Sequence, residues 1–230
     1  MSAIVASLSG GLDSAVLCAM LLEERRRHPV LPVFFRYGAK HGPWEEDAAH
    51  RVAEYFSLQL TLVDLRAAFS HMTSPLLAAD TRPIPKADYD RASMAHTLVP
   101  GRNLIFASFL AAIAESRQAD ALALATHAGD HCLYPDCRPA FNAALAGVIM
   151  ESSEGKVRLL TPLDGMDKAA IVAQGIRLGV PFALTRSCYE NQPVSCGECG
   201  TCRERLAAFA ANGITDPLAY VAMPDGGRFA

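Results

Sequence analysis

The clearest sign of the fold of this chain is the segment Ile4-Val5-Ala6-Ser7-Leu8-Ser9-Gly10-Gly11-Leu12-Asp13-Ser14. Its first five residues are an apolar run typical of a buried strand, and the run 15–22 that follows is typical of a helix. Two glycines and two serines therefore lie at a strand-to-helix junction. Glycines let the backbone approach a ligand, and a helix N-terminus offers unpaired N–H groups, so the loop predicts an oxyanion site. The alternative is a tight turn capped by Asp13 or Ser14.

Short apolar runs alternate with longer helical segments along most of the chain, which is the pattern of an α/β protein. It predicts a doubly wound, mainly parallel sheet of about five strands. The predicted strands are 4–8, 31–35, 58–64, 121–126 and 157–160, and the predicted helices are 15–27, 44–56, 103–116, 139–153 and 167–178.

Two segments depart from this alternation. Residues 73–100 are irregular and rich in proline and charge, which predicts an insertion such as a substrate-covering loop, a partner surface or a small subdomain. From Pro181 the chain is loop-like and rich in cysteine, before a predicted helix at 203–211. We therefore expect an α/β domain over residues 1–180 and a small C-terminal segment over 181–230.

The composition of the 230 residues is that of a globular protein, with 51% hydrophobic and 20% charged residues. Its formal net charge of −3 argues against a protein that coats DNA or an anionic membrane by bulk charge. The most apolar window, Leu104–Ala114, ends at Glu115, which is too short for a membrane span. No signal peptide is evident at the N-terminus, so we expect a cytoplasmic enzyme without direct nucleic-acid binding.

Four of the seven cysteines lie within fifteen residues, and two intervening glycines allow tight turns. Four thiolates directed at one point suit a tetrahedral Zn²⁺, and such a site is structural because no position is left open for catalysis. Disulfides, an iron–sulfur cluster and a redox-active Cys-x-x-Cys are the alternatives. Nearby arginines at 186, 203 and 205 are expected to balance the thiolate charge. The predicted zinc ligands are Cys188, Cys196, Cys199 and Cys202.

Two cations lie where a helix dipole opposes them. Arg102 precedes the predicted helix 103–116, and Lys168 follows the predicted cap Asp167. A cation at a helix N-terminus is unfavourable by about 0.3–1 kcal/mol unless an anion is near. A bound phosphate explains both positions, and an exposed side chain in water is the alternative.

The loop at residues 9–14 is neither a Walker loop, because no Gly-Lys-Ser/Thr follows, nor a dinucleotide fingerprint, because its glycines are adjacent. Ser-Gly-Gly-x-Asp-Ser resembles the pyrophosphate (PP) loop of the ATP pyrophosphatases, of adenine nucleotide α-hydrolase-like fold. Three further motifs narrow the resemblance to the 7-cyano-7-deazaguanine synthase family. They are Val99-Pro100-Gly101-Arg102-Asn103, Tyr134-Pro135-Asp136-Cys137-Arg138-Pro139, and Ser187-Cys188-Tyr189 followed by Cys196-Gly197-x-Cys199-x-x-Cys202-x-x-Arg205.

This resemblance implies an ATP-dependent ligase that converts 7-carboxy-7-deazaguanine and ammonia into the nitrile used for queuosine, through an adenylated acid and an amide. It also implies Mg²⁺ and a homodimer. The implied catalytic residues are Asp13, Ser14, Arg102 and Lys168. The implied ATP site comprises Leu8, Ser9, Gly10, Gly11, Leu12, Asp13, Ser14, Ala15, Val16, Leu17 and Cys18, although Cys18 itself reads as core packing.

The loop 126–138 follows a predicted central strand, so it should face the same cleft as the first loop. Given the resemblance, Asp130 or Asp136 is expected to accept from the guanine-like edge and Arg138 to hold the substrate carboxylate. Tyr134 completes the predicted substrate site. The alternative is that Asp136 and Arg138 pair with each other and cap the helix at Pro139. The histidines of this loop read as ordinary loop residues, since no third metal ligand accompanies them.

Three other functions compete with this one. A tRNA-thiolating enzyme with the same loop would need an RNA-binding surface, which the net charge does not favour. A relative that transfers the activated deazapurine to another nucleophile is the second. The third, a non-enzymatic zinc-knuckle binding module, leaves the ATP-type loop unexplained.

Overall fold

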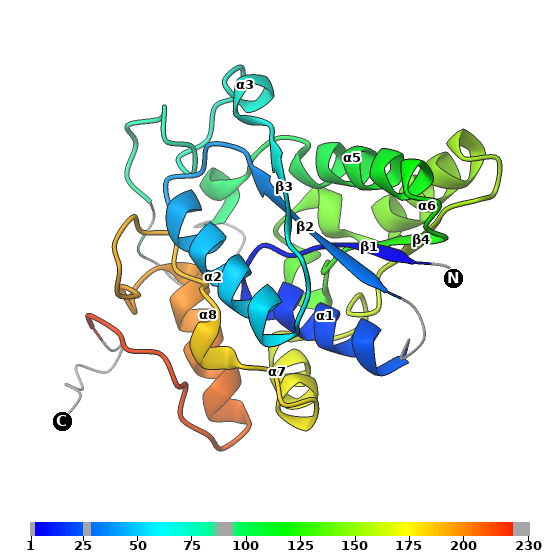
Figure 1. Cartoon of the computed structure of the whole chain (residues 1–230). Helices are drawn as coiled ribbons and strands as arrows, with labels where there is room; N and C mark the ends of the chain where they lie inside the picture. The colour runs from blue at the N-terminus through cyan, green and yellow to red at the C-terminus, as the bar shows by residue number, and fades with distance from the viewer. Residues whose placement is uncertain (1–2, 25–28, 85, 87–93, 223–230) are drawn as a thin grey trace.

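The computed structural model describes residues 3–24, 29–84, 86 and 94–222. Its sheet contains β1 (Ile4–Ser7), β2 (Val30–Arg36), β3 (Thr61–Asp64), β4 (Ala121–Ala123) and β5 (Arg158–Leu160). The strands lie in the order β3-β2-β1-β4-β5, and every neighbouring pair is parallel. The prediction of a doubly wound parallel sheet is therefore confirmed (Figure 1).

Helices cover both faces of the sheet. The longer helices are α1 (Leu12–Glu24), α2 (Gly42–Tyr55), α5 (Arg102–Ser116), α6 (Pro139–Ser152), α7 (Lys168–Arg177) and α8 (Gly200–Ala211). Short helical turns are α3 (Arg66–Phe69), η1 (Ala95–Thr97), η2 (Ala128–Asp130), η3 (Pro135–Cys137) and η4 (Phe182–Leu184). One core lies among α1, α2, α7, α8 and the sheet, and the other lies between the sheet and α5 and α6 (Figure 1).

The central strand explains why both cores form. Side chains of β1 alternate, so Ile4 and Ala6 enter the first core while Val5 enters the second. All three are fully buried, because helices cover the sheet on both sides. The continuous apolar run at the start of the chain is therefore the sequence signature of a central parallel strand.

Element boundaries differ from the predicted ones where an apolar run leaves the sheet. Leu58 and Leu60 pack against the core before β3 pairs at Thr61, so apolarity extends beyond pairing. In the same way β4 ends at Ala123, three residues before the predicted end, and the chain turns toward a pocket. Residues 25–27 of the first predicted helix, and residues 85 and 87–93 of the predicted insertion, lie outside the described residues. The domain boundary near residue 180 stays a prediction.

The strand order places a topological switch point between β1 and β4, because the chain continues outward from them in opposite directions. Ligands of open α/β sheets bind at the carboxyl ends of such strands. Within the described residues, no helix is both long and apolar enough to cross a membrane.

Candidate active site

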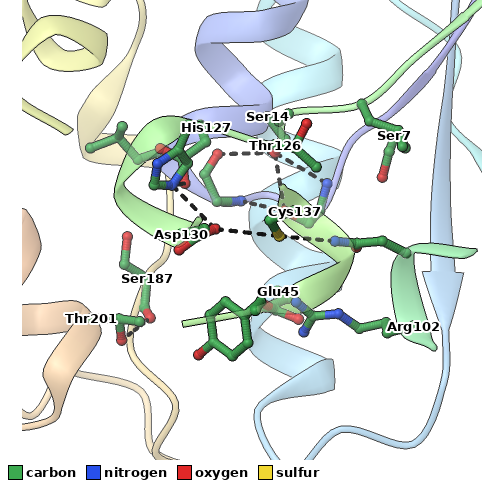
Figure 2. Close-up of a pocket in the computed structure, with 18 of the residues that line it drawn as sticks. Ser7, Ser14, Glu45, Arg102, Thr126, His127, Asp130, Cys137, Ser187 and Thr201 are labelled. Atoms are coloured by element: carbon green, nitrogen blue, oxygen red, sulfur yellow. Dashed lines mark hydrogen bonds and ion pairs between the residues drawn. The ribbon is translucent and has the colours of Figure 1, made fainter. Parts of the chain in front are cut away.

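A pocket opens at the carboxyl ends of β1 and β4, at the switch point of the sheet (Figure 2). The first loop, the loop after β4, the N-termini of α2, α5 and α7, and the cysteine-rich segment all contribute to its wall. Its lining includes Ser9, Gly11, Leu12, Asp13, Ser14, Glu45, Arg102, His127, Asp130, Tyr134, Lys168, Arg186 and Glu204. Segments from the whole length of the chain therefore meet here.

The first loop is held in shape by its own hydroxyl groups. The backbone N–H of Ser9 donates to Oγ of Ser14 at 3.2 Å, and that hydroxyl donates to the carbonyl of Gly11 at 3.0 Å. Gly10 has φ of +78°, and a Cβ built on it would lie 2.4 Å from the carbonyl oxygen of Glu45. Glycine is required at position 10 because the chain turns left-handed there and α2 packs directly against it.

Lys168 joins the first loop to α7 and to the loop after β4. Its Nζ lies 2.8 Å from both carboxylate oxygens of Asp13 and 2.9 Å from Nε2 of His127. Glu204 of α8 lies 3.3 Å from the same ammonium, and His127 lies 3.4 Å from Asp130. A half-buried cation thus contacts two carboxylates and one imidazole at the start of a helix.

The pKa values in this cluster follow from burial and from these contacts. Burial opposes ionisation of Asp13, yet Lys168 and His127 together hold its pKa below the usual value. Burial raises the pKa of Glu204 to about 7, and it lowers the pKa of His127, which Lys168 lowers further. The acidic neighbours outweigh burial at Lys168 and raise its pKa, so the ammonium stays charged. A phosphate chain entering here would meet a fixed cation.

The pocket has a second polar end, which lies apart from His127 in Figure 2 and contains Glu45 and Arg102. The guanidinium of Arg102 lies 6.0 Å from the centre of the Tyr37 ring, within cation–π range. Arg186 donates to the carbonyls of Glu190, Gln192 and Pro193. This end combines aromatic rings with two guanidinium groups and one carboxylate.

The predicted substrate residues are divided by the structure. Asp130 and Tyr134 line the pocket, whereas Asp136 and Arg138 are not in its lining. Asp136 accepts from the backbone N–H of Asn103 at 3.0 Å and so serves the N-terminus of α5. Arg138 donates to the carbonyl of His131 at 2.9 Å. The alternative prediction, in which Asp136 and Arg138 pair with each other and cap the helix at Pro139, is therefore wrong. Asp136 instead accepts a hydrogen bond from the N-terminus of α5.

Only some of the residues predicted to form the ATP site line the pocket. Ser9, Gly11, Leu12, Asp13 and Ser14 line the pocket. The others, Leu8, Gly10, Ala15, Val16, Leu17 and Cys18, are not in its lining, and the apolar ones among them are buried in the core beneath it. Burial raises the pKa of the Cys18 thiol to about 12, as expected for a packing residue.

The four predicted metal ligands come together beside the pocket. The sulfur atoms of Cys188, Cys196, Cys199 and Cys202 all lie within 4.8 Å of one another, and those of Cys196 and Cys202 are 3.9 Å apart. Backbone N–H groups of residues 190, 196, 198 and 199 donate to Cys188 or Cys196 at 3.2–3.4 Å. Such donors favour thiolates, so this cluster can hold a metal ion.

The prediction that arginines balance this cluster is wrong for Arg205. Its guanidinium forms a bidentate pair with Asp216 at 2.6 and 3.0 Å, and both side chains are almost fully buried. Arg205 also donates to the Thr185 hydroxyl at 2.7 Å. Its charge therefore joins α8 to the segment that follows it and is not left for the metal.

Several pocket residues escape prediction from the sequence. His127 reads as an ordinary loop residue, but the structure buries it against Lys168. Glu204 and Glu45 look like members of solvated helix faces, since other charged residues adjoin them. The one available signal for Glu204 is its place within the cysteine-rich segment, two residues after a predicted ligand.

The switch-point pocket, the serine-glycine loop and the lysine at the start of α7 together define the PP-loop class of α/β proteins. NMN synthetase from Francisella tularensis has a similar fold, with a TM-score of 0.51 and 14% identity over 93% of this chain and 78% of that one. The family model of the queuosine biosynthesis protein QueC matches residues 3–213, and the chain belongs to this family.

Curated relatives agree with this assignment. The 7-cyano-7-deazaguanine synthase of Marinobacter nauticus is 38% identical over 94% of this chain and 96% of its own. That of Ruegeria pomeroyi is 40% identical over 92% and 91%. The resemblance inferred from four motifs is thereby confirmed, and the chain is an enzyme.

Proposed function

We propose that this enzyme converts 7-carboxy-7-deazaguanine and ammonia into 7-cyano-7-deazaguanine at the expense of ATP, as a step in queuosine precursor biosynthesis. The observation that carries the proposal is the contact of Lys168 with Asp13 at the pocket, in a chain related to enzymes of that name. Both residues were predicted as catalytic from positions 155 residues apart.

ATP is proposed to bind with its phosphates over the first loop. Hydroxyl groups of Ser9 and Ser14, backbone N–H groups at the start of α1 and the ammonium of Lys168 would contact the phosphate oxygens. Asp13 holds Lys168 in position. Leu8, Gly10 and the buried residues 15–18 shape the loop from below, and Arg102 stabilises charge from the opposite wall.

The reaction is proposed to activate one carbon twice. The substrate carboxylate attacks the α-phosphate of ATP, so a carboxylate O–P bond forms and pyrophosphate leaves. Ammonia then attacks the acyl carbon, loses a proton and displaces AMP to give the amide. A second ATP activates the amide oxygen in the same way, with release of pyrophosphate, and loss of AMP and of both amide protons leaves the nitrile. Residues of the pocket align these groups and neutralise charge.

Asp130 and Tyr134 are proposed to contact the deazaguanine directly, since both line the pocket. Asp136 and Arg138 are proposed to act from outside the lining. Asp136 fixes the first turn of α5, which begins at Arg102. Arg138 donates to the loop that carries Asp130.

The pocket suits Mg²⁺, because the carboxylates of Asp13 and Asp130 both face it and hard cations prefer oxygen ligands. When bound, Mg²⁺ would neutralise charge on the phosphate oxygens. These two residues are proposed to hold it together with ATP. Lys168 supplies a further positive charge on the same wall.

The cysteine cluster is proposed to hold a structural Zn²⁺. Tetrahedral thiolates about 2.3 Å from one ion lie roughly 3.8 Å apart, which agrees with the 3.9 Å between Cys196 and Cys202. Disulfide sulfurs would be bonded at about 2 Å. In an iron–sulfur cluster the four thiolates are divided among two or four irons, so the sulfurs as a set spread further.

The cellular setting is also proposed. A thiolate site of this kind persists under reducing conditions, which supports a cytoplasmic location. We expect a homodimer of this chain, no direct nucleic-acid binding, and a zinc segment over residues 181–230 appended to the ATP-binding domain 1–180.

One incubation tests the proposed function. Zinc-containing protein is mixed with ATP, Mg²⁺, ammonium and 7-carboxy-7-deazaguanine, and mass spectrometry follows the base and the nucleotides. We expect the amide and then the nitrile, with two AMP and two pyrophosphate per nitrile. Alanine at Asp13 or Ser14 should abolish turnover, while S108A, at an exposed serine of α5, should not. ATP cleavage without nitrile would point instead to transfer of the activated base to another nucleophile.

A further inference from the structure

Glu45 is a carboxylate of the pocket to which the mechanism above gives no role. It lies in the first turn of α2 and lines the pocket at the end shared with Arg102 (Figure 2). Its side chain is 17% exposed. Among the described residues, one basic side chain lies within 4 Å of its carboxylate: Nε2 of His41 is 3.5 Å from Oε2 of Glu45.

The contact between His41 and Glu45 is not an ion pair. The imidazole is buried, and burial together with Arg102 and Arg186 lowers its pKa to about 3, so it is neutral at physiological pH. In the structure, each of the other acids of the pocket contacts a lysine or an imidazole of the pocket wall. Asp13 and Glu204 contact Lys168, and Asp130 lies 3.4 Å from His127. Among the described residues, Glu45 is thus the pocket carboxylate that has neither a charged partner at ion-pair distance nor a role in holding ATP or Mg²⁺, so it can accept hydrogen bonds from a further ligand.

The surroundings of Glu45 suit a flat heterocycle. Tyr37, Tyr134, Tyr189 and Phe106 line the same pocket. Aromatic rings pack on the faces of planar ligands, while a nearby polar group fixes their orientation. Burial raises the pKa of Glu45 to about 7, although Arg102 and Arg186 favour its ionised form. Hydrogen bonds donated by a ligand would further stabilise the ionised carboxylate of Glu45.

We propose that Glu45 is a specificity-determining residue that accepts hydrogen bonds from the N1–H and the exocyclic amine of the deazaguanine. The inference rests on the proposed function and adds which residue selects the base. Two adjacent donors on one edge match the two oxygens of a carboxylate. An adenine edge offers an amine beside an unprotonated ring nitrogen, which a carboxylate would repel, so the match favours the guanine-type substrate over the adenine of ATP.

The test compares E45Q with the matched control E46Q. Glu46 is the next residue of α2, but its carboxylate pairs with Arg36 and does not line the pocket. Each protein is given 7-carboxy-7-deazaguanine or the analogue that lacks the exocyclic amine, and KM for ATP is measured with both. Binding of 7-cyano-7-deazaguanine is measured separately by calorimetry, because binding does not depend on turnover.

In E45Q we expect kcat/KM for the full substrate to fall about 10- to 100-fold, since an amide oxygen can satisfy one donor while its NH₂ opposes the other. The analogue should lose much less, KM for ATP should stay within about twofold, and E46Q should resemble the unaltered enzyme. Equal losses on both bases, or a raised KM for ATP with discrimination retained, would overturn the inference. Binding of the base that depends on Glu45 in a protein that makes no nitrile would refute the proposed function alone.

Discussion

Nζ of Lys168 lies 2.8 Å from each carboxylate oxygen of Asp13, and this contact joins the first turn of α1 to the first turn of α7. The side chains of Lys168 and Asp13 are only 13% and 26% exposed. Water screens this ion pair less than it screens a pair on the surface. Removal of either residue would leave the charge of the other without its partner.

Replacement of Lys168 by methionine should therefore impair both stability and catalysis. We expect the free energy of unfolding to fall by about 3 kcal/mol and kcat/KM to fall at least ~100-fold, as for loss of a group that stabilises transition-state charge. The control is R177M, which breaks the exposed pair of Arg177 with Glu23 and should leave the urea midpoint almost unchanged. Urea unfolding and initial rates give both numbers; equal behaviour of the two variants would contradict the role of Lys168.

Alanine at Gly10 should displace α2 from the first loop. A Cβ at position 10 would lie 2.4 Å from the Glu45 carbonyl and 2.6 Å from the Ala49 nitrogen. Gly38 is the matched control, since it has φ of +84° but nothing within 4 Å of such a Cβ. G38A should cost about 1–2 kcal/mol for the left-handed backbone, and G10A about 1–3 kcal/mol more for the clash. Only G10A should raise KM for ATP.

Replacement of Cys199 by serine should release the metal. Elemental analysis should find one zinc per chain in the unaltered protein and in C132S, whose cysteine is exposed and outside the cluster. C199S should lack stoichiometric zinc and unfold at lower urea concentration, because ligand binding contributes to folding free energy. Iron in place of zinc, or full stability after chelation, would contradict a structural zinc site.

The buried pair of Arg205 and Asp216 should be among the costliest to break. Asp216 also accepts from the Tyr220 hydroxyl at 2.6 Å, so it joins the chain after α8 to the helix. D216N should lower the free energy of unfolding by about 3–5 kcal/mol. D64N breaks the exposed pair of Asp64 with Arg66 and should leave the urea midpoint almost unchanged. Comparable urea midpoints for the two variants would show that Asp216 is not the anchor of this segment.

His41 should make the protein less stable in acid. Its pKa is lowered to about 3, chiefly by burial, whereas the imidazole in the unfolded chain has its ordinary pKa of 6.5. The unfolded state therefore binds the extra proton first, so stability is full above pH 6.5 and falls as the pH drops toward 3. Between pH 8 and 5 this amounts to about 2 kcal/mol.

The variant H41Q isolates this effect. Glu45 has a pKa raised to about 7 and works in the opposite direction, but burial causes its shift and His41 is not among the causes. The unaltered protein should thus lose about 2 kcal/mol more than H41Q between pH 8 and 5. Urea unfolding at the two pH values measures the difference, and parallel pH profiles would mean that His41 is protonated in the folded state.

The fold could be predicted because its signals are local. The run 4–8 is apolar throughout because its strand is covered on both faces of the sheet. The glycine loop directly after it marks the junction with a helix whose N-terminus can accept an anion. The four cysteines lie within fifteen residues, so their meeting required little chain closure. The boundaries were less exact because apolar residues such as Leu58 pack on the core without pairing in the sheet.

The rest of the site depended on contacts between distant segments. Glu45 and Glu204 have the local sequence signature of solvated helix faces, and only the packing of α2 and α8 turns them into the pocket. His127 became a buried partner of Lys168, and Asp136 served α5 instead of lining the pocket. Period and spacing in the sequence predict the fold class, which the structure confirms, and the spacing of the four cysteines predicts the cluster that the structure brings together. Which charges are buried together follows only from the packed chain, because burial depends on contacts between segments that are distant in the sequence.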